Sequence, residues 1–388
     1  MNYVLWLASW YPNELTPYDG DFIQRQAKAV SAFQRITVFH FRKDEKSSVT
    51  KNTKTVLSSS KNLDEIIVFY HPLKTGVPIL DRIISTIKYK KTYTEVLKNY
   101  INKNGKPSLV HVHVALKAGL QALYLKRVFR VSYIVTEHWT GYYPNASVNI
   151  FNKGVVFRNY TESVLKSASL LLPVTKDLGK AINKIVQIPY KVVANVVDTE
   201  LFYYKPEEIT GFKFLHVSSL NFHKNPEGII AAIKELADEG ISFTCSFVGW
   251  VTNELIALSD SLSLTNKVIF FKSPVSYVQV AKEMQQASAF ILFSRVENLP
   301  CVVLEALCCG VPVISSDVGG VSEVINQTNG ILVEPGNKEE LKKAMKKMML
   351  DYQLFNREFI AESAADKFSF DVIGKQIADT YKSLSQIN

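Results

Sequence analysis

The sequence has little cysteine and no long apolar run. Only four of its 388 residues are cysteine (Cys245, Cys301, Cys308 and Cys309), and they form no C-x-x-C pair or Cys/His cluster. A disulfide framework and a structural zinc site are therefore not indicated, and a reducing cytoplasm is the expected setting. No apolar run approaches the ~18 residues of a membrane-spanning helix, and the N-terminus lacks a basic leader with a signal-peptide core. The sequence predicts a cytoplasmic protein without a membrane span.

The overall composition is that of an ordinary globular protein. Hydrophobic residues make up 47% and charged residues 21% of the chain, which excludes disorder, collagen and coiled coil as global descriptions. Lys and Arg number 45 against 36 for Asp and Glu, and the net charge of +9 suits anionic ligands, an anionic membrane surface or nucleic acid. The basic residues lack the aromatic interleaving of a nucleic-acid-binding module, so nucleic acid is not an expected partner.

Short β-branched or aromatic runs alternate with longer helical patterns, which is typical of parallel α/β sheets. The first half of the chain has runs at 4–9, 36–41, 66–70, 109–114, 133–136, 170–174 and 192–196. A second series follows the polar stretch 198–211, at 214–218, 243–248, 268–271, 289–293, 311–315 and 330–333. Because one sheet of all these strands would be unusually large, the sequence predicts two doubly wound parallel sheets joined by a linker.

Two further segments of the first half have their own interpretations. The stretch 43–62 is rich in Lys, Ser, Thr and Asn, and we expect a mobile surface loop there. The stretch 78–101 combines helical apolar spacing with basic residues such as Lys88, Lys90 and Lys91. One interpretation is a helix packed on its own sheet with a solvated charged face; the other is a helix that docks on an anionic bilayer. The two interpretations are compatible.

The stretch 289–314 is the most informative for chemistry, because it predicts strand, loop, helix and strand in succession. Pro300 suits a first helical turn and Gly310 suits a helix end. The first-turn amides of such a helix bind phosphate. Two carboxylates lie eight positions apart, Glu297 in the loop and Glu305 in the helix. A carboxylate can accept hydrogen bonds from a ribose diol, or favour positive charge that develops at an anomeric carbon.

These residues together resemble a known enzyme signature. Glu297 and Glu305, the segment Gly310-Val311-Pro312-Val313 and the segment 317–324 resemble the motifs of the retaining, GT-B-fold glycosyltransferases of family four (glycosyl transferases group 1). Segments 329–333 and 335–337 continue the resemblance, as do Ser219 and Lys224 upstream. The N-terminal half is similar only in outline, at 10–12 with Gly20, at 112–113, at 136–138 and at 195–198.

The resemblance implies a GT-B fold of two facing Rossmann-like doubly wound parallel-sheet domains with an interdomain cleft. Residues 1–200 would form the acceptor-binding domain, 201–369 the nucleotide-sugar-binding domain, and 370–388 a helix that crosses back onto the first domain. The implied activity is retaining, metal-independent transfer of a hexose-type sugar from a nucleotide diphosphate sugar to an acceptor hydroxyl. Cell-surface polysaccharide or glycolipid synthesis is the expected setting, with a saccharide or lipid-linked acceptor and a peripheral position on the inner face of the cell membrane.

The resemblance also assigns roles to single residues. Glu305 would hold the ribose, and Lys224 with the helix amides near Val302 and Val303 would hold the diphosphate. Glu297 with the Asn298 and Leu299 backbone would orient the sugar. The expected catalytic residues are Glu297, His138 and Lys224, and the expected donor-binding residues are Gly20, Ser219, Lys224, Glu297, Asn298, Leu299, Val302 and Glu305. Plainer alternatives are a surface glutamate at 305, a loop charge at 297, a strand-ending histidine at 138 and a solvated lysine at 224.

Two departures leave a rival function open. Ser219 stands where the family usually has an arginine that neutralises the diphosphate. Asp19-Gly20-Asp21 spells the Asp-x-Asp of metal-dependent transferases, but it lies in the first loop, so neither a metal nor another cofactor is expected. With the basic helix, Ser219 motivates the alternative of a catalytically inactive sugar-nucleotide sensor or scaffold at a membrane surface. A sugar-nucleotide epimerase of the same fold is a weaker rival.

Overall fold

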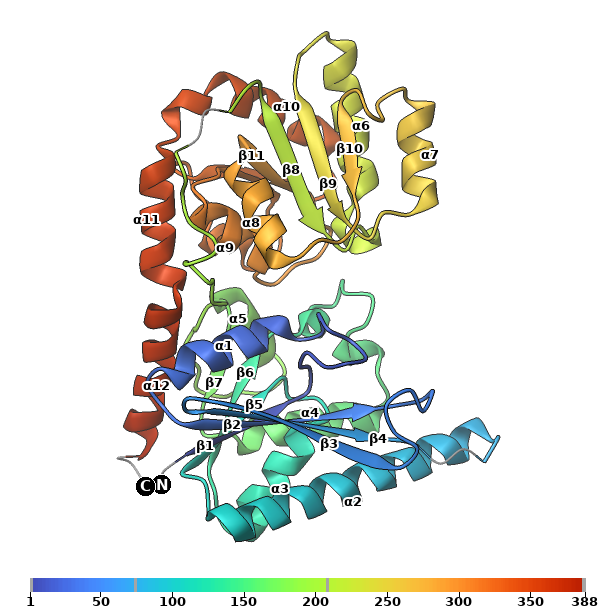
Figure 1. The fold of residues 1–388 in the computed structure, drawn as a ribbon, viewed down its shortest axis with the longest axis vertical. Coiled ribbons are helices and arrows are strands. Elements are labelled where there is room, and N and C mark those ends of the chain that lie inside the picture. The colour runs from blue at the N-terminus through green and yellow to red at the C-terminus, as the bar shows by residue number, and fades with distance from the viewer. Residues whose placement is uncertain (1–2, 73–74, 207–208, 386–388) are drawn as a thin grey trace. The chain divides into compact units, whose positions relative to one another are not determined.

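The computed structural model describes residues 3–72, 75–206 and 209–385, which form two compact units (Figure 1). The first unit takes in the chain up to Val174, the stretch Gly179–Val196 and the chain from Phe370 on. The second takes in Thr175–Leu178 and Val197–Ser369. Each unit is built around its own β-sheet, and no helix among the described residues is long and apolar enough to cross a bilayer.

The sheet of the first unit has the order β3-β4-β2-β1-β5-β6-β7 in the described residues. All neighbouring strands are parallel except β3 and β4. The strands are β1 (Val4–Ala8), β2 (Ile36–Lys43), β3 (Thr53–Ser60), β4 (Leu63–Tyr70), β5 (Leu109–His113), β6 (Tyr133–Glu137) and β7 (Leu171–Pro173). The central strands β1, β5 and β6 are buried along their whole length, as expected for parallel strands that are covered on both faces.

Helices cover this sheet, and the last one comes from the far end of the chain. They are α1 (Asp21–Ser31), α2 (Pro78–Asn104), α3 (Gly119–Phe129), α4 (Val155–Ser167) and α12 (Phe370–Ser385), while α5 (Lys176–Asn183) has residues in both units. Helix α12 packs on α1, and a Cβ added to Gly374 would lie 2.4 Å from the carbonyl oxygen of Ala29. The Tyr381 hydroxyl hydrogen-bonds His111 Nδ1 at 2.6 Å. The final helix therefore completes the core of the first unit.

Two expectations for the first unit were wrong. The stretch 43–62 is not a loop throughout, because Thr53–Ser60 forms β3, antiparallel to β4. Its side chains are almost all exposed, so the usual apolar signal of a strand is missing. The stretch 192–196 forms no regular strand, although the Val193 amide donates to the Pro173 carbonyl of β7 at 3.1 Å. Val193 and Val196 are buried, and an isolated bridge joins Val197 to Ser369.

The sheet of the second unit is parallel throughout, in the order β10-β9-β8-β11-β12-β13. The strands are β8 (Lys213–Ser218), β9 (Thr244–Gly249), β10 (Ile269–Lys272), β11 (Ala289–Leu292), β12 (Val313–Ser316) and β13 (Gly330–Val333), each at an expected position. The helices are α6 (Pro226–Asp238), α7 (Asn253–Ser261), α8 (Tyr277–Gln285), α9 (Cys301–Cys308), α10 (Lys338–Leu350) and α11 (Arg357–Phe368). Helix α10 packs on α6, whereas α9 packs on α8 and α11.

The contact of Tyr381 with His111 gives a stability prediction for α12. His111 is fully buried and also hydrogen-bonds Thr136 Oγ1 at 2.7 Å. Tyr381→Phe removes one partner from a buried imidazole, so the free energy of unfolding should fall by about 1–3 kcal/mol. Chemical denaturation monitored by fluorescence measures the change. Tyr18→Phe, at an exposed tyrosine, is the control; equal stability of the two variants would contradict the prediction.

Candidate functional site

Two neighbouring strands of the second unit deliver the central residues of the candidate site. Strands β8 and β11 are parallel neighbours, so the loops that follow them leave the same edge of the sheet. The loop after β8 contains Ser219 and the 3₁₀ turn Phe222–Lys224, and the loop after β11 contains Ser294 and Glu297. The fold therefore brings together residues that are about seventy positions apart in the sequence.

Lys224 and Glu297 form an ion pair in these loops. The Lys224 ammonium donates to Glu297 Oε1, which also accepts from the Ser294 hydroxyl at 2.8 Å. The Glu297 side chain is only 9% exposed and that of Lys224 is 22% exposed. A carboxylate this buried stays charged only beside a cation or strong donors. The pair thus holds one cation and one anion side by side at the carboxyl edge of the sheet.

Further contacts fix the position of Lys224. Asn221 Oδ1 accepts hydrogen bonds from the amides of His223 at 3.0 Å and Lys224 at 3.3 Å. The Arg295 amide donates to the His223 carbonyl at 2.8 Å. The Arg295 guanidinium donates to the Phe222 carbonyl and lies 4.2 Å from the centre of its ring. The two loops are therefore tied together by backbone and side-chain contacts of Arg295, while Ser219 is exposed.

The backbone beyond Glu297 is fixed by a pair of glycines. A Cβ on Gly319, whose φ is +55°, would lie 2.2 Å from the Glu297 carbonyl oxygen, and one on Gly320 would lie 2.1 Å from Thr175 Cγ2. The Gly320 amide donates to the Asn298 carbonyl at 3.0 Å, and Asn298 Oδ1 accepts from the Thr175 hydroxyl at 3.1 Å. No side chain other than hydrogen fits at these two positions without movement of the loop that carries Glu297 and Asn298.

Helix α9 follows this loop and carries the remaining predicted donor-binding residues of the second unit. Pro300 was predicted in the first turn of α9, but it lies just before the helix and has extended backbone. The Val303 amide donates to the Pro300 carbonyl at 3.1 Å, so of the two predicted phosphate-binding amides only that of Val302 stays available. Leu299 is buried, and Glu305 lies in the second turn with 1% of its surface exposed. A ligand that reaches Glu305 must therefore contact a buried carboxyl group.

In the first unit, Glu137 organises the loops at the carboxyl edge of the sheet. Its Oε1 accepts from the Ala115 amide at 2.7 Å and the Tyr142 hydroxyl at 2.9 Å. Its Oε2 accepts from the amides of His138 at 3.2 Å and Trp139 at 3.3 Å. Glu137 is fully buried, and this burial raises its pKa to about 7. One carboxyl group thus joins the segment after β5 to the segment after β6, which carries His138.

His138 is half-buried, with its ring 4.6 Å from that of Phe22. Burial lowers its pKa to about 3, against the opposing effect of a hydrogen bond with Asn195. The imidazole is therefore neutral at physiological pH and acts as a hydrogen-bonding group, not as a cation. His113, its neighbour, is fully buried and stacks on Trp6 at 3.9 Å between ring centres, which is the packing of a core residue.

Gly20 is a steric requirement of the first loop. Its φ is +71°, and an added Cβ would lie 2.5 Å from the carbonyl carbon of Trp10. The flanking carboxylates face arginines: Asp19 lies 3.5 Å from Arg42, and Asp21 lies 3.1 Å from Arg25. Across the described part of the chain, no group of three or more His, Cys, Asp or Glu side chains could hold a metal ion.

Sequence reasoning missed three residues that shape these loops: Ser294, Asn221 and Glu137. Ser294 and Asn221 each lie three residues before a predicted site residue, and a serine or asparagine at such a spacing often caps a turn. That signal was present in the sequence. Glu137 precedes His138 directly, but its partner Ala115 lies 22 residues away, which no local pattern shows.

Known proteins resemble this chain along most of its length. Residues 204–365 match the family described as glycosyl transferases group 1. TuaC of Bacillus subtilis, a glycosyltransferase that its name assigns to teichuronic acid biosynthesis, is 26% identical over 363 residues, which are 88% of each chain. The solved structure of sucrose-phosphate synthase from Thermosynechococcus elongatus has a TM-score of 0.79 at 17% identity, over 100% of both chains. HepE of Anabaena, solved in complex with UDP and glucose, has a TM-score of 0.73 at 17% identity, over 99% of this chain and 100% of that one.

The raised pKa of Glu137 predicts a pH dependence of stability. Between its ordinary pKa of 4.5 and about 7, the native state keeps a proton that the unfolded state has released. The free energy of unfolding should therefore fall as the pH rises through this window, by up to about 3 kcal/mol from this group. Glu137→Gln cannot ionise, so urea denaturation from pH 4.5 to 7.5 should show a smaller fall than in the wild type.

Glu14→Gln is the matched control, since Glu14 is exposed. Its pH profile should follow that of the wild type. A Glu137→Gln profile parallel to both would show that Glu137 ionises normally in the native state.

Proposed function

Because residues 204–365 match the glycosyl transferases group 1 and the chain has the GT-B fold, we propose that it transfers a hexose-type sugar from a nucleotide diphosphate sugar to an acceptor hydroxyl, with retention at the anomeric carbon. The Lys224–Glu297 pair at the carboxyl edge of the second sheet is the observation that carries this proposal. HepE, a neighbour in fold, was solved with UDP and glucose, and TuaC is named for teichuronic acid biosynthesis. Both names support a nucleotide sugar donor and a glycoconjugate product.

Lys224 and Glu297 each stabilise one of the two charges that develop during the reaction. The bond from the anomeric carbon to the diphosphate oxygen breaks, and negative charge grows on the diphosphate while positive charge grows on the sugar. Lys224 opposes the first change and Glu297 the second. The acceptor oxygen forms the new bond on the same face, and its proton passes to the departing diphosphate. No enzyme nucleophile is needed for retention by this route.

The neighbouring residues hold the donor. The amide of Val302, at the positive end of α9, contacts the diphosphate, and Glu305 accepts hydrogen bonds from the ribose hydroxyls. The backbone at Asn298 and Leu299 orients the sugar. Ser219 offers a hydroxyl where an arginine is usual, and Arg295, whose amide is bonded to His223 beside Lys224, is the cation assigned to compensate part of the missing charge. From the first unit, His138 donates or accepts a hydrogen bond at the sugar as a neutral imidazole, and Gly20 lets the first loop approach the donor.

We propose that the reaction needs no metal and no cofactor, with the nucleotide sugar as co-substrate. The acceptor is a saccharide or a lipid-linked saccharide, and the protein works in the cytoplasm at an anionic membrane surface. The alternative, an inactive sensor of nucleotide sugars at a membrane surface, rests on Ser219 and the basic helix α2. Donor hydrolysis without acceptor separates the two, because a transferase releases some sugar to water and a pure sensor releases none. An NMR spectrum of the first-formed product reports the anomeric configuration.

Lys224 should be necessary for donor binding and for transfer. A nucleotide at 100 times its dissociation constant stabilises the native state by about 2.7 kcal/mol, so thermal-shift screening with UDP, GDP, ADP and their sugars identifies the donor. Lys224→Ala should then weaken its affinity about 10- to 100-fold, since hydrogen bonds to charged groups contribute about 1.5–3 kcal/mol. Turnover should fall further. Lys267→Ala, at an exposed lysine of the same unit, should change neither, and full turnover of Lys224→Ala would remove Lys224 from the diphosphate.

Glu305 is tested by a double cycle, because its carboxyl group is buried and a structural role is the competing explanation. Glu305→Gln should lower the affinity for the ribonucleotide about 10-fold or more. A nucleotide without 2′ and 3′ hydroxyls should bind the wild type weakly and the variant equally weakly. Calorimetry of the four combinations measures the coupling. If the two losses add, Glu305 does not contact the ribose.

A further inference from the structure

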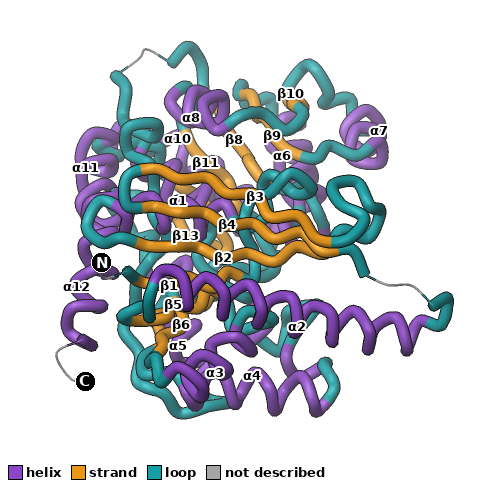
Figure 2. The backbone as a smooth tube through the Cα atoms, turned by 60° about the horizontal axis from the view of Figure 1, so that its bottom comes forward, coloured by secondary structure: helices purple, strands orange, loops and turns teal. Residues whose placement is uncertain are grey.

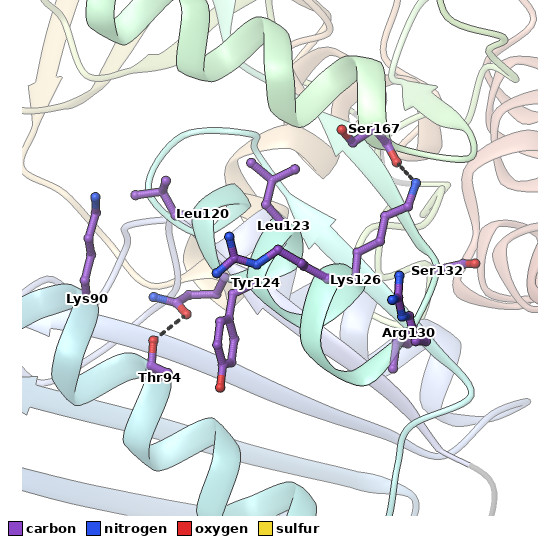
Figure 3. A pocket seen from close by; sticks show the side chains of 12 residues that line it. Lys90, Thr94, Leu120, Leu123, Tyr124, Lys126, Arg130, Ser132 and Ser167 are labelled. Carbon is purple, nitrogen blue, oxygen red and sulfur yellow. Dashed lines mark hydrogen bonds between the residues drawn. The ribbon is translucent and has the colours of Figure 1, made fainter.

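A basic groove lies in the first unit, at the opposite edge of the sheet from Glu137. Its volume is about 870 Å³, and it is lined by residues of α2 and α3, by the segment 130–132 before β6, and by Ser167 at the end of α4 (Figure 3). Val131 and Ser132 directly precede β6, whereas Glu137 ends it. The groove is therefore separate from the loops at the carboxyl edge of the sheet that carry His138.

The charged side chains of the groove all have the same sign. Lys90, Lys126, Arg127 and Arg130 line it, and none of its described lining residues is acidic. The Lys126 ammonium is fixed by a hydrogen bond to the Ser167 carbonyl at 2.7 Å. In the described part of the chain, no carboxylate pairs with Lys90, Arg127 or Arg130, and all three are exposed. Four cations without counter-charges favour a strongly anionic ligand.

The uncharged part of the lining includes apolar side chains, and it continues onto an exposed face of α2. Leu120, Leu123, Tyr124 and Val131 provide apolar surface beside the cations. On α2, Ile83, Ile87, Lys90 and Thr94 follow helical spacing and share one face. Thr94 hydrogen-bonds Gln121 of α3 at 3.2 Å, which joins that face to the groove.

The beginning of α2 leaves large apolar side chains in solvent. Ile79, Ile83 and Ile87 are 73%, 50% and 60% exposed. Figure 2 shows the first turns of α2 extending beyond the other helices of the first unit. A row of exposed isoleucines beside a cationic groove has the chemistry of a surface that meets headgroups and acyl chains together.

We propose that this groove binds the phosphate headgroups of an anionic phospholipid bilayer, while the exposed row of α2 enters the boundary between the headgroups and the acyl chains. Arg127 and Arg130 can each donate two hydrogen bonds to one phosphate, and Lys90 and Lys126 add charge. The inference names the membrane partner of the proposed function and rests on it only for the lipid-linked acceptor. The groove itself is independent of the donor chemistry.

Sedimentation of the full chain with vesicles tests this docking surface. The wild type should bind vesicles of phosphatidylcholine mixed with phosphatidylglycerol, and bind vesicles of phosphatidylcholine alone much more weakly. The groove variant, Arg127→Glu with Arg130→Glu, should have a partition coefficient on the anionic vesicles that is at least 10-fold lower than that of the wild type. Ile83→Ser with Ile87→Ser should lower it without a change in net charge. Lys28→Glu with Lys61→Glu, at exposed lysines elsewhere on the first unit, reverses the same amount of charge and should retain binding.

Three results would overturn the proposal. One is a wild type that does not bind the anionic vesicles. Another is an equal loss in the groove variant and in the Lys28/Lys61 control, which would make the attraction one of net charge alone. The third is a combination of two observations: inorganic phosphate stabilises the wild type but not the groove variant, and the wild type does not bind vesicles. That combination would make the groove a site for soluble phosphate.

The same variants separate this inference from the proposed function. The groove variant should keep its thermal stabilisation by the donor nucleotide identified for the wild type, because the groove shares no residue with the proposed donor-binding set and lies at the opposite edge of the first sheet from the loop that carries His138. Its retained melting temperature without ligand also shows that it folds. Vesicle binding without any nucleotide effect would leave the docking surface standing and contradict the transferase.

Discussion

Parallel strands that are covered on both faces leave room for charged side chains mainly at their ends. In both units the central strands are buried and mostly apolar, and a polar side chain within them, such as His111, is hydrogen-bonded. Charged side chains near the sheet therefore lie at strand ends or in the loops that follow. The carboxyl edge of the second sheet holds the Lys224–Glu297 pair, and that of the first holds Glu137. The basic groove occupies the other edge of the first sheet. The ion pair and Glu137 thus lie where the strands end, whereas the basic groove lies where the strands of the first sheet begin.

The same constraint explains how much of the fold the sequence predicts. Buried parallel strands need continuous apolar runs, and all six strands of the second unit were found from such runs. Strand β3 was not predicted because it lies at the sheet edge with both faces in water. Its Thr, Lys and Ser residues therefore lack the apolar pattern of a buried strand. The segment 192–196 was wrongly assigned because its valines are buried without a regular strand ladder: one backbone hydrogen bond joins Val193 to Pro173 of β7.

For the candidate site, sequence predicts residue identity better than environment. The family motif identifies Lys224 and Glu297, and the structure shows them in contact. It does not predict that Glu305 is almost wholly buried, or that His138 is kept neutral by burial. Glu137 was overlooked because a carboxylate at a strand end is usually solvated. Its importance depends on Ala115 and Tyr142, which only the folded chain brings to it.

Helix α12 also bears on the synthesis of the protein. The core of the first unit includes Ile373, Ile377 and Tyr381, and these residues leave the ribosome after the whole second unit has been made. While the chain is being translated, α1 therefore exposes the surface that α12 later covers. The second unit, whose residues end at Ser369, can complete its sheet earlier. The N-terminal unit is the first to be synthesised and the last to be finished.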